Sequence, residues 1–440
     1  MAPSRFFDVQ SRSLMFALPR FTPQSTSRRP AGGTSFSALA VATLLLGAGL
    51  LLPACEKDTP DDFGGDPAYR GELISYEKTD SWTQTQVDSV INELGLTIVA
   101  ANGLDIYKLL YKTIDALGES QTIASGALMV PTGIAGPFPM SSYQHGTIVR
   151  KDDVPSMGSG ETLIGVLFSS TGFVTVMPDY LGLGESPGLH PYVHSKSEAT
   201  ASVDMLRASK AVLDEIGVAD NDQLFLFGYS QGGHATMALL QEIEARHADE
   251  FNITAAAPMS GPYDLVGAQT DMLLSGDPYA SPFYLPYIMF AFNSIYDMYP
   301  STTDFLKEPW ATTLPPLFNG LYSAWEINPS VPASPIEIVR DDVLDDFINN
   351  PENPFRKALE DNTQLAIAPK APTRMYYCTG DDQVLYRSAI NARAAYLDLG
   401  VDVPAINGET LTGGAPLDHA GCVEPSLISA QIWFNSLREN

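Results

Sequence analysis

The chain reads Phe225-Leu-Phe-Gly-Tyr-Ser-Gln-Gly-Gly-His234 near its middle. An apolar run stops at Gly228, and a helical pattern begins two residues after Ser230. Gly-x-Ser-x-Gly between a strand and a helix is typical of a nucleophile elbow, a turn so tight that the backbone of the serine is strained. Gly228 and Gly232 fit this turn because they lack the Cβ atoms that would collide with neighbouring backbone. The stretch therefore predicts a serine hydroxyl exposed at the carboxyl end of a strand.

Length and charge narrow the classes of protein to consider. The 440 residues, 45% of them hydrophobic, are enough for one large α/β domain with an insertion, or for two domains. The net charge is −27, and no basic patch follows residue 30. Because nucleic-acid phosphates require clustered Lys and Arg side chains, we expect no nucleic-acid partner.

Residues 1–55 resemble an export signal and are not expected to join the fold. The apolar run 38–52 is too short for a comfortable membrane span. It ends in Leu52-Pro-Ala-Cys55, which resembles the bacterial lipobox and implies that Cys55 becomes the lipidated first residue of the mature protein. The segment before the run is long for such a signal, so translation could begin at Met15 or later. The alternative is an ordinary signal peptide with a chance cysteine.

The residues after Cys55 are polar and acidic, so we expect a solvated tether over residues 56–70. The protein should then face an extracytoplasmic compartment, periplasmic or at the cell surface, on a membrane that holds its N-terminal lipid. Without the lipid it would be secreted.

The rest of the chain alternates between strand and helix patterns. Apolar residues at helical spacing from Val87 to Leu94 predict that a short amphipathic helix opens the folded part. Residues 105–115 and 122–130 predict an antiparallel hairpin. Besides the elbow, the patterns predict strands at 140–143, 173–177, 253–260, 374–378 and 401–406, and helices at 197–216, 232–245, 386–399 and 425–437. Strands that alternate with helices predict a mostly parallel sheet with helices on both faces.

This alternation stops between Gly261 and Pro372. The stretch is rich in proline and aromatic residues and shows few clear strands. We interpret residues 262–372 as a helical cap inserted into the sheet domain, which would then comprise 71–261 and 373–440. Most of the aromatic side chains should form the core of the cap, and some should face the serine.

A serine hydroxyl needs a base, and the base needs an orienting carboxylate. In chains with this elbow the order is Ser, then Asp, then His. His419 fits, because it lies in a loop between the last strand and the last helix. His234 should point away from the hydroxyl and either pack or face solvent. His190 and His194 could line the site, but both precede the serine.

The acid is expected in the loop that follows the strand after the cap. Asp381 and Asp382 are adjacent there. Asp381 is favoured because it lies three residues before Val384, as in an Asp-x-x-Val pattern, and Asp382 is the alternative. Asp418 is a poorer candidate, because its side chain should diverge from that of the neighbouring histidine.

Two backbone donors are needed for the oxyanion of a tetrahedral intermediate. The N–H of Gln231 is available at the start of the elbow helix. The second donor is expected at the N–H of Thr147, with Gly146 allowing the backbone to come close.

Residues from about 105 to 437 resemble an α/β-hydrolase, and within that fold the secreted lipase and esterase group. The resemblance implies a Ser–His–Asp esterase with no cofactor or metal, whose cap shapes the acyl or alcohol pocket and whose substrate is a small-molecule or lipid ester. Gly-Tyr-Ser-Gln-Gly also occurs in cutinase-like enzymes, but those are smaller and lack such a cap. The residues that carry the resemblance are Tyr143-Gln-His-Gly-Thr147, Pro178-Asp-Tyr-Leu-Gly-Leu-Gly184, Gly228–Gly232, Gly380-Asp381 and His419.

Two other functions compete with ester hydrolysis. A serine peptidase of the same fold is disfavoured because no large gating domain precedes the hydrolase part. An inert surface-binding protein is disfavoured because Ser230, Asp381 and His419 are all present.

Two cysteines remain once Cys55 is assigned to lipid. Cys378 lies three residues before Asp381, and Cys422 lies three residues after His419. If the aspartate and the histidine meet, the cysteines are brought to the same corner. A disulfide between them is then possible in an extracytoplasmic compartment, and two buried free thiols are the alternative.

Overall fold

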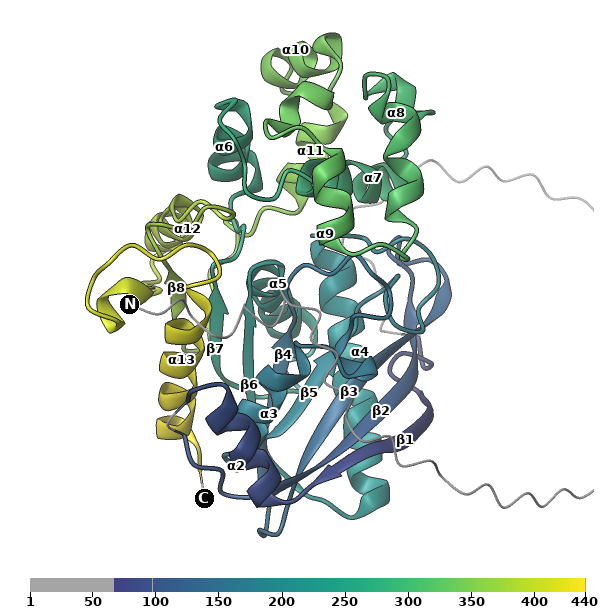
Figure 1. Ribbon diagram of the computed structural model, residues 1–440. Coiled ribbons are helices and arrows are strands. Elements are labelled where there is room, and N and C mark those ends of the chain that lie inside the picture. Colours follow the sequence, from purple (N-terminus) through teal and green to yellow (C-terminus); the bar gives the residue numbers. More distant parts are fainter. Residues whose placement is uncertain (1–66, 97, 440) are drawn as a thin grey trace, which may run out of the picture. The chain divides into compact units, whose positions relative to one another are not determined.

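The computed structural model of the protein describes residues 67–96 and 98–439 (Figure 1). The proposed signal segment, Cys55 and all but the last residues of the tether lie outside the described residues. From Ala68 onward the described chain forms one unit. Within it, no helix is long and apolar enough to cross a membrane.

The centre of the fold is a sheet in the order β1-β2-β3-β5-β4-β6-β7-β8-β9. The pairs β1–β2, β2–β3 and β3–β5 are antiparallel, and the pairs β5–β4, β4–β6, β6–β7, β7–β8 and β8–β9 are parallel. The mostly parallel sheet predicted from the sequence is therefore confirmed. The strands span Leu73–Trp82 (β1), Gly103–Ile114 (β2), Gln121–Thr132 (β3), Phe138–Gln144 (β4), Val174–Pro178 (β5), Asp220–Tyr229 (β6), Ile253–Met259 (β7), Met375–Tyr377 (β8) and Ala405–Asn407 (β9).

The hairpin prediction is confirmed, because β2 and β3 pair antiparallel from Gly103–Thr132 to Ile114–Gln121. The prediction that a helix opens the folded part is wrong. The helix exists as α2 (Gln84–Glu93), but the edge strand β1 precedes it. Every residue of β1 is at least partly exposed, so the strand lacks the apolar alternation that identifies a half-buried strand.

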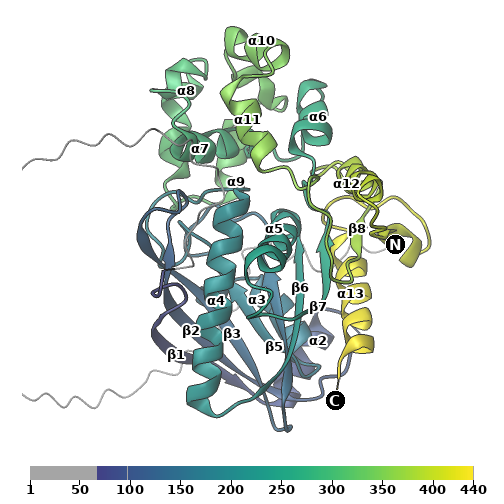
Figure 2. The same ribbon diagram turned by 180° about the vertical axis from the view of Figure 1, so that it is seen from behind.

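Helices cover both faces of the sheet, and each face has its own apolar core. Along β6, Leu224 and Leu226 pack on one face, while Phe225 and Phe227 pack on the other. Figure 2 shows α4 and α5 over the first face, and Figure 1 shows α2, α3 and α13 over the second. These helices, together with α12, span Ser195–Ile216 (α4), Gln231–Arg246 (α5), Thr162–Ser169 (α3), Val423–Leu437 (α13) and Arg387–Asp398 (α12).

The chain leaves the sheet after Met259 and rejoins it at Met375. The residues in between are mainly helical and build a separate apolar core, which includes Phe290, Phe292 and Phe305. This insertion lies beyond the carboxyl ends of the parallel strands (Figure 1). Its α-helices span Thr270–Leu274 (α6), Tyr284–Tyr296 (α7), Trp310–Thr313 (α8), Ala324–Ile327 (α9), Asp341–Asn349 (α10) and Pro354–Asp361 (α11).

Candidate active site

Ser230 lies at the sharp junction between β6 and α5. Its backbone has φ 61° and ψ −124°, a strained conformation for a residue other than glycine. A Cβ on Gly232 would lie 1.9 Å from the carbonyl oxygen of Gln144, and one on Gly228 would lie 2.3 Å from the carbonyl oxygen of Gly232. The two glycines are therefore required by the close approach of backbone, as the sequence pattern predicts.

His419 and Asp381 are in direct contact. The Nδ1 atom of His419 lies 2.8 and 2.9 Å from the two carboxylate oxygens of Asp381, and both side chains are buried. The backbone N–H groups of Gln383 and Val384 donate to Oδ1 of Asp381 at 3.0 and 2.8 Å, which orients the carboxylate. This contact places the proton of a neutral His419 on Nδ1 and leaves Nε2 as the acceptor.

The two alternative aspartates occupy supporting positions. Asp382 accepts a hydrogen bond from the backbone N–H of His419 at 3.2 Å. Asp418 accepts one from the backbone N–H of Gly421 at 2.7 Å. Both carboxylates therefore hold the backbone of the histidine loop, whereas Asp381 contacts the imidazole ring itself.

Two cavities meet at Ser230. One is mainly apolar and extends into the insertion as far as Leu344 and Phe347 of α10. The other has more polar lining and includes Gly146, Thr147, Ser230 and His419. Ser230 thus lines both a mainly apolar space and a more polar space that it shares with His419.

Tyr284 and Gln383 lie between the two cavities, since they line both of them together with Ser230. The hydroxyl of Tyr284 donates to Oε1 of Gln383 at 2.8 Å. The hydroxyl of Tyr279 donates to the backbone carbonyl of Gln383 at 2.6 Å. The insertion is therefore hydrogen-bonded to the loop that carries Asp381.

The expected oxyanion donors lie beside the serine. Gln231 is the first residue of α5, so its N–H is one of the helix-terminal donors without an intrahelical partner. A Cβ on Gly146 would lie 3.9 Å from the Cβ of Ser230, which places the backbone of Gly146 next to the elbow. The hydroxyl groups of Thr147 and Tyr192 are 3.0 Å apart and hydrogen-bonded, which anchors this loop.

The other histidines near the elbow are buried and form hydrogen bonds with other groups. His234 is not solvent-facing: its ring is fully buried, and its Nδ1 lies 2.7 Å from a carboxylate oxygen of Glu198. Burial lowers the pKa of both His190 and His194 to about 4, so both rings are neutral at pH 7. None of the three contacts Asp381.

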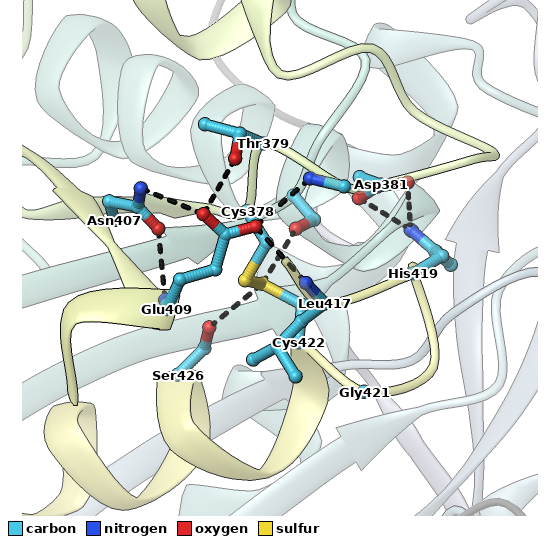
Figure 3. Close-up of a disulfide and its surroundings, with 12 residues drawn as sticks. Cys378, Thr379, Asp381, Asn407, Glu409, Leu417, His419, Gly421, Cys422 and Ser426 are labelled. Carbon is cyan, nitrogen blue, oxygen red and sulfur yellow. Dashed lines mark hydrogen bonds and ion pairs between the residues drawn. A yellow bond between two sulfur atoms is a disulfide. The ribbon is translucent and has the colours of Figure 1, made fainter. Parts of the chain in front are cut away.

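Two residues that hold the site, Tyr229 and Glu409, are not predicted from the sequence. The hydroxyl of Tyr229 donates to the backbone carbonyl of His419 at 2.7 Å. The carboxylate of Glu409 accepts from the hydroxyl of Thr379 at 2.6 Å and from the backbone N–H groups of Gly380 and Leu417 at 3.0 and 3.1 Å (Figure 3). Glu409 thereby ties the Asp381 loop to the His419 loop. No local motif marks it, since its contacts with the Asp381 loop are distant in sequence and its contact with Leu417 is to a backbone group.

Cys378 and Cys422 form a disulfide, with their Cα atoms 5.9 Å apart and a sequence separation of 44. The bridge lies next to Glu409 and joins the end of β8 to the residue before α13 (Figure 3). On the chain-entropy model, closing a loop of this size stabilises the fold by about 4 kcal/mol. Among residues 67–96 and 98–439, no cluster of three His, Cys, Asp or Glu side chains could hold a metal.

We expect Glu409→Gln to remove a pH-dependent contribution to stability. Burial raises the pKa of this carboxyl, but hydrogen bonds from Thr379, Leu417, Asn407 and Gly380 outweigh burial and lower it to about 2. In the unfolded chain the pKa of a glutamate is about 4.3. The carboxylate therefore stabilises the fold above about pH 4.3, and this contribution is lost as the pH falls towards 2.

Melting temperatures measured by circular dichroism from pH 7 to pH 3 test this. The difference in melting temperature between wild type and Glu409→Gln should be largest at pH 7 and should decrease below about pH 4.5. Glu93→Gln makes the same chemical change at an exposed position of α2 and serves as the control. A difference in melting temperature between wild type and Glu409→Gln that is the same at every pH contradicts the expectation.

Comparisons with known proteins agree with this geometry. Residues 156–403 match the model of the secretory lipase family. The rice cell wall degrading esterase LipA from Xanthomonas oryzae is similar over 84% of this chain and 96% of its own, with 29% identity and a TM-score of 0.72. A Legionella pneumophila protein described as a hydrolase is similar over 84% of this chain and 100% of its own, with 27% identity and a TM-score of 0.76.

Candida antarctica lipase A shares the fold at 17% identity, with a TM-score of 0.56 over 76% of each chain. No curated protein sequence matches the chain. The family match spans more than half of the 440 residues. The chain therefore belongs to the secretory lipase family, has the α/β-hydrolase fold and is a hydrolase that acts on esters.

Proposed function

We propose that the protein hydrolyses carboxylic esters with Ser230 as nucleophile, His419 as general base and Asp381 as the orienting acid. The observation that carries this proposal is the 2.8 Å contact between His419 Nδ1 and Asp381, in a chain where His419 and the strained Ser230 line one cavity. Catalysis by such a triad requires the carboxylate to hold the imidazole in one tautomer, with Nε2 free to accept a proton.

The reaction then proceeds in two halves through an acyl-enzyme. The Ser230 hydroxyl oxygen bonds to the ester carbonyl carbon, and its proton passes to Nε2 of His419. The oxyanion accepts hydrogen bonds from the backbone N–H groups of Gln231 and Thr147, with Gly146 leaving room for the approach. His419 returns the proton to the departing alcohol. A water molecule repeats the same steps to release the acid.

The two cavities support an assignment of the two halves of the substrate. The apolar cavity suits an acyl chain, because hydrocarbon burial is favourable there. The more polar cavity, which His419 lines, suits the alcohol that takes up the proton. In this assignment residues 262–372 act as a cap that sets acyl-chain preference, and residues 71–261 and 373–440 carry the catalytic groups.

Ser230→Ala should abolish hydrolysis of p-nitrophenyl butyrate and labelling by a fluorophosphonate probe, with an unchanged melting temperature. His419→Ala and Asp381→Asn should each lower kcat by roughly 10⁴-fold. Combining either with Ser230→Ala should add little, because the triad acts as a unit. Asp382→Asn is the matched control and should be much milder. Faster turnover of dipeptide amides than of esters would instead favour a peptidase.

Leu344→Trp should narrow the acyl preference. Leu344 lines the apolar cavity from α10, at the far end of the insertion from the sheet (Figure 1), so the larger indole should obstruct long chains before short ones. We expect kcat/KM to fall for p-nitrophenyl esters of twelve or more carbons and to be kept for the butyrate. Leu321→Trp makes the same change at a position of the insertion that is 69% exposed, and should leave the profile unaltered. Equal losses at all chain lengths would argue against an acyl-binding role for the cavity.

The family name and the Leu52-Pro-Ala-Cys55 sequence support export from the cytoplasm. We propose that the mature protein begins at a lipidated Cys55 and stays on the membrane surface. Mass spectrometry of the N-terminal peptide should show a diacylglycerol-modified cysteine, and Cys55→Ser should release the protein from the membrane fraction. An unmodified N-terminus at another residue would exclude the anchor and leave secretion as the outcome.

A further inference from the structure

A cluster of buried polar side chains lies directly behind the elbow, and the mechanism above does not use it. Glu198 of α4 contacts both Gln231 and His234 of α5, and Gln231 also contacts His190. All four side chains are at most 2% exposed. Burying a carboxylate is costly unless it is paired, so a cluster of this kind requires an explanation.

The hydrogen positions in the cluster follow from its contacts. Nε2 of Gln231 lies 2.8 Å from Oε1 of Glu198 and 2.8 Å from Nε2 of His190. Nδ1 of His190 lies 2.8 Å from the backbone carbonyl of Leu181, so it carries the ring proton and Nε2 is the acceptor. Burial lowers the pKa of His190 to about 4, in agreement with a neutral ring. The two N–H groups of the Gln231 side-chain amide therefore donate to different partners, one to Glu198 and the other to His190.

The amide is held in this orientation at a cost. Oε1 of Gln231 is buried and has no hydrogen-bond partner within residues 67–96 and 98–439. An unpaired buried acceptor destabilises the fold. Glu198 and His190 nevertheless keep the nitrogen of the amide turned towards them, because a hydrogen bond to an ionised carboxylate is stronger than one between neutral groups.

The second carboxylate oxygen of Glu198 limits the charge of the cluster. It lies 2.7 Å from Nδ1 of His234, whose Nε2 lies 2.8 Å from the backbone carbonyl of Asn362. Both ring nitrogens of His234 thus face oxygen acceptors. A neutral imidazole has only one N–H group, so both hydrogen bonds form only when the Glu198–His234 pair holds one additional proton. With that proton the pair has no net charge, and it does not oppose the negative charge that develops on a substrate oxygen at the elbow.

We propose that Glu198 is a positioning residue for the oxyanion donor. By holding the side-chain amide of Gln231, it fixes the first residue of α5 and keeps the backbone N–H of Gln231 directed at the substrate oxygen. The inference rests on the proposed function, in which this N–H stabilises the tetrahedral intermediate. Fixed donors matter because they need no reorganisation during the reaction.

Four variants test the proposal. Glu198→Ala removes the acceptor, and Glu198→Gln keeps an acceptor oxygen at the same distance from the backbone. Gln231→Met removes the amide and leaves Glu198 in place, which tests the contact from its other end. Val203→Ala is the control, because Val203 lies on the same helix, is fully buried and belongs to the apolar core on that face. The readouts are kcat, KM, melting temperature and the inhibition constant of an alkyl trifluoromethyl ketone, whose adduct with the serine carries an oxyanion.

Glu198→Ala and Gln231→Met should each lower kcat by roughly 10- to 100-fold, the range expected for a misplaced catalytic group, with KM changed little. The inhibition constant of the ketone should rise by the same factor. Glu198→Gln should recover most of the activity. The double variant Glu198→Ala/Gln231→Met should be no worse than either single variant, because both remove one contact.

Three results would overturn the proposal: full kcat in Glu198→Ala, an equal kcat loss in Val203→Ala, or a loss in Glu198→Ala with an unchanged inhibition constant. Failure of the proposed function itself is recognised separately. In that case the ketone does not inhibit the wild type, and Ser230→Ala keeps its activity.

Discussion

The structure depends on the close approach of three stretches of backbone at the elbow. A Cβ on Gly232 would lie 1.9 Å from the carbonyl oxygen of Gln144 at the end of β4, and one on Gly233 would lie 2.4 Å from that of Met259 at the end of β7. The backbone N–H of Ser230 also donates to Met259 at 2.9 Å. The strained serine is therefore held by the strands on both sides of β6, which explains how one residue can keep an unfavourable conformation.

A second convergence, at the ends of β8 and β9, holds the two partners of the serine. The Cys378–Cys422 disulfide and the carboxylate of Glu409 join the same two loops, one covalently and one through hydrogen bonds (Figure 3). Tyr229, next to the serine, binds the backbone of His419 and connects this corner to the elbow. Because the loops are fixed by the disulfide and by these hydrogen bonds, the Asp381–His419 pair is organised before any substrate arrives.

The surroundings of the elbow differ between its two sides. The cavity above it is apolar and belongs largely to the insertion, whereas the cluster behind it is polar and fully buried. Asn362, just after α11, accepts from His234, so the returning end of the insertion is bonded to the helix that carries the proposed oxyanion donor. Together with the bonds from Tyr279 and Tyr284 to Gln383, this ties the insertion both to the donor helix and to the acid loop.

Features with a local cause could be predicted from the sequence alone. The glycine spacing around Ser230 predicted the elbow, because only glycine fits so tight a turn. Alternating residues predicted the β2–β3 hairpin, whose strands are close in sequence. The order of Ser230, Asp381 and His419 could be proposed because chain order and loop position are sequence properties.

Contacts between residues that are far apart in sequence could be identified only from the tertiary structure. Asp381 and Asp382 are neighbours in one loop, and the contact with His419, 38 residues from Asp381, distinguishes them. The edge strand β1 is identified by its pairing with β2, since its exposed side chains show no alternation. The partners of Glu198 on α5 lie 33 and 36 residues away, so no local pattern relates them. These hydrogen bonds form because the fold packs α4 against α5. A hydrogen bond requires that its two atoms approach within about 3 Å, and sequence spacing does not specify such a distance.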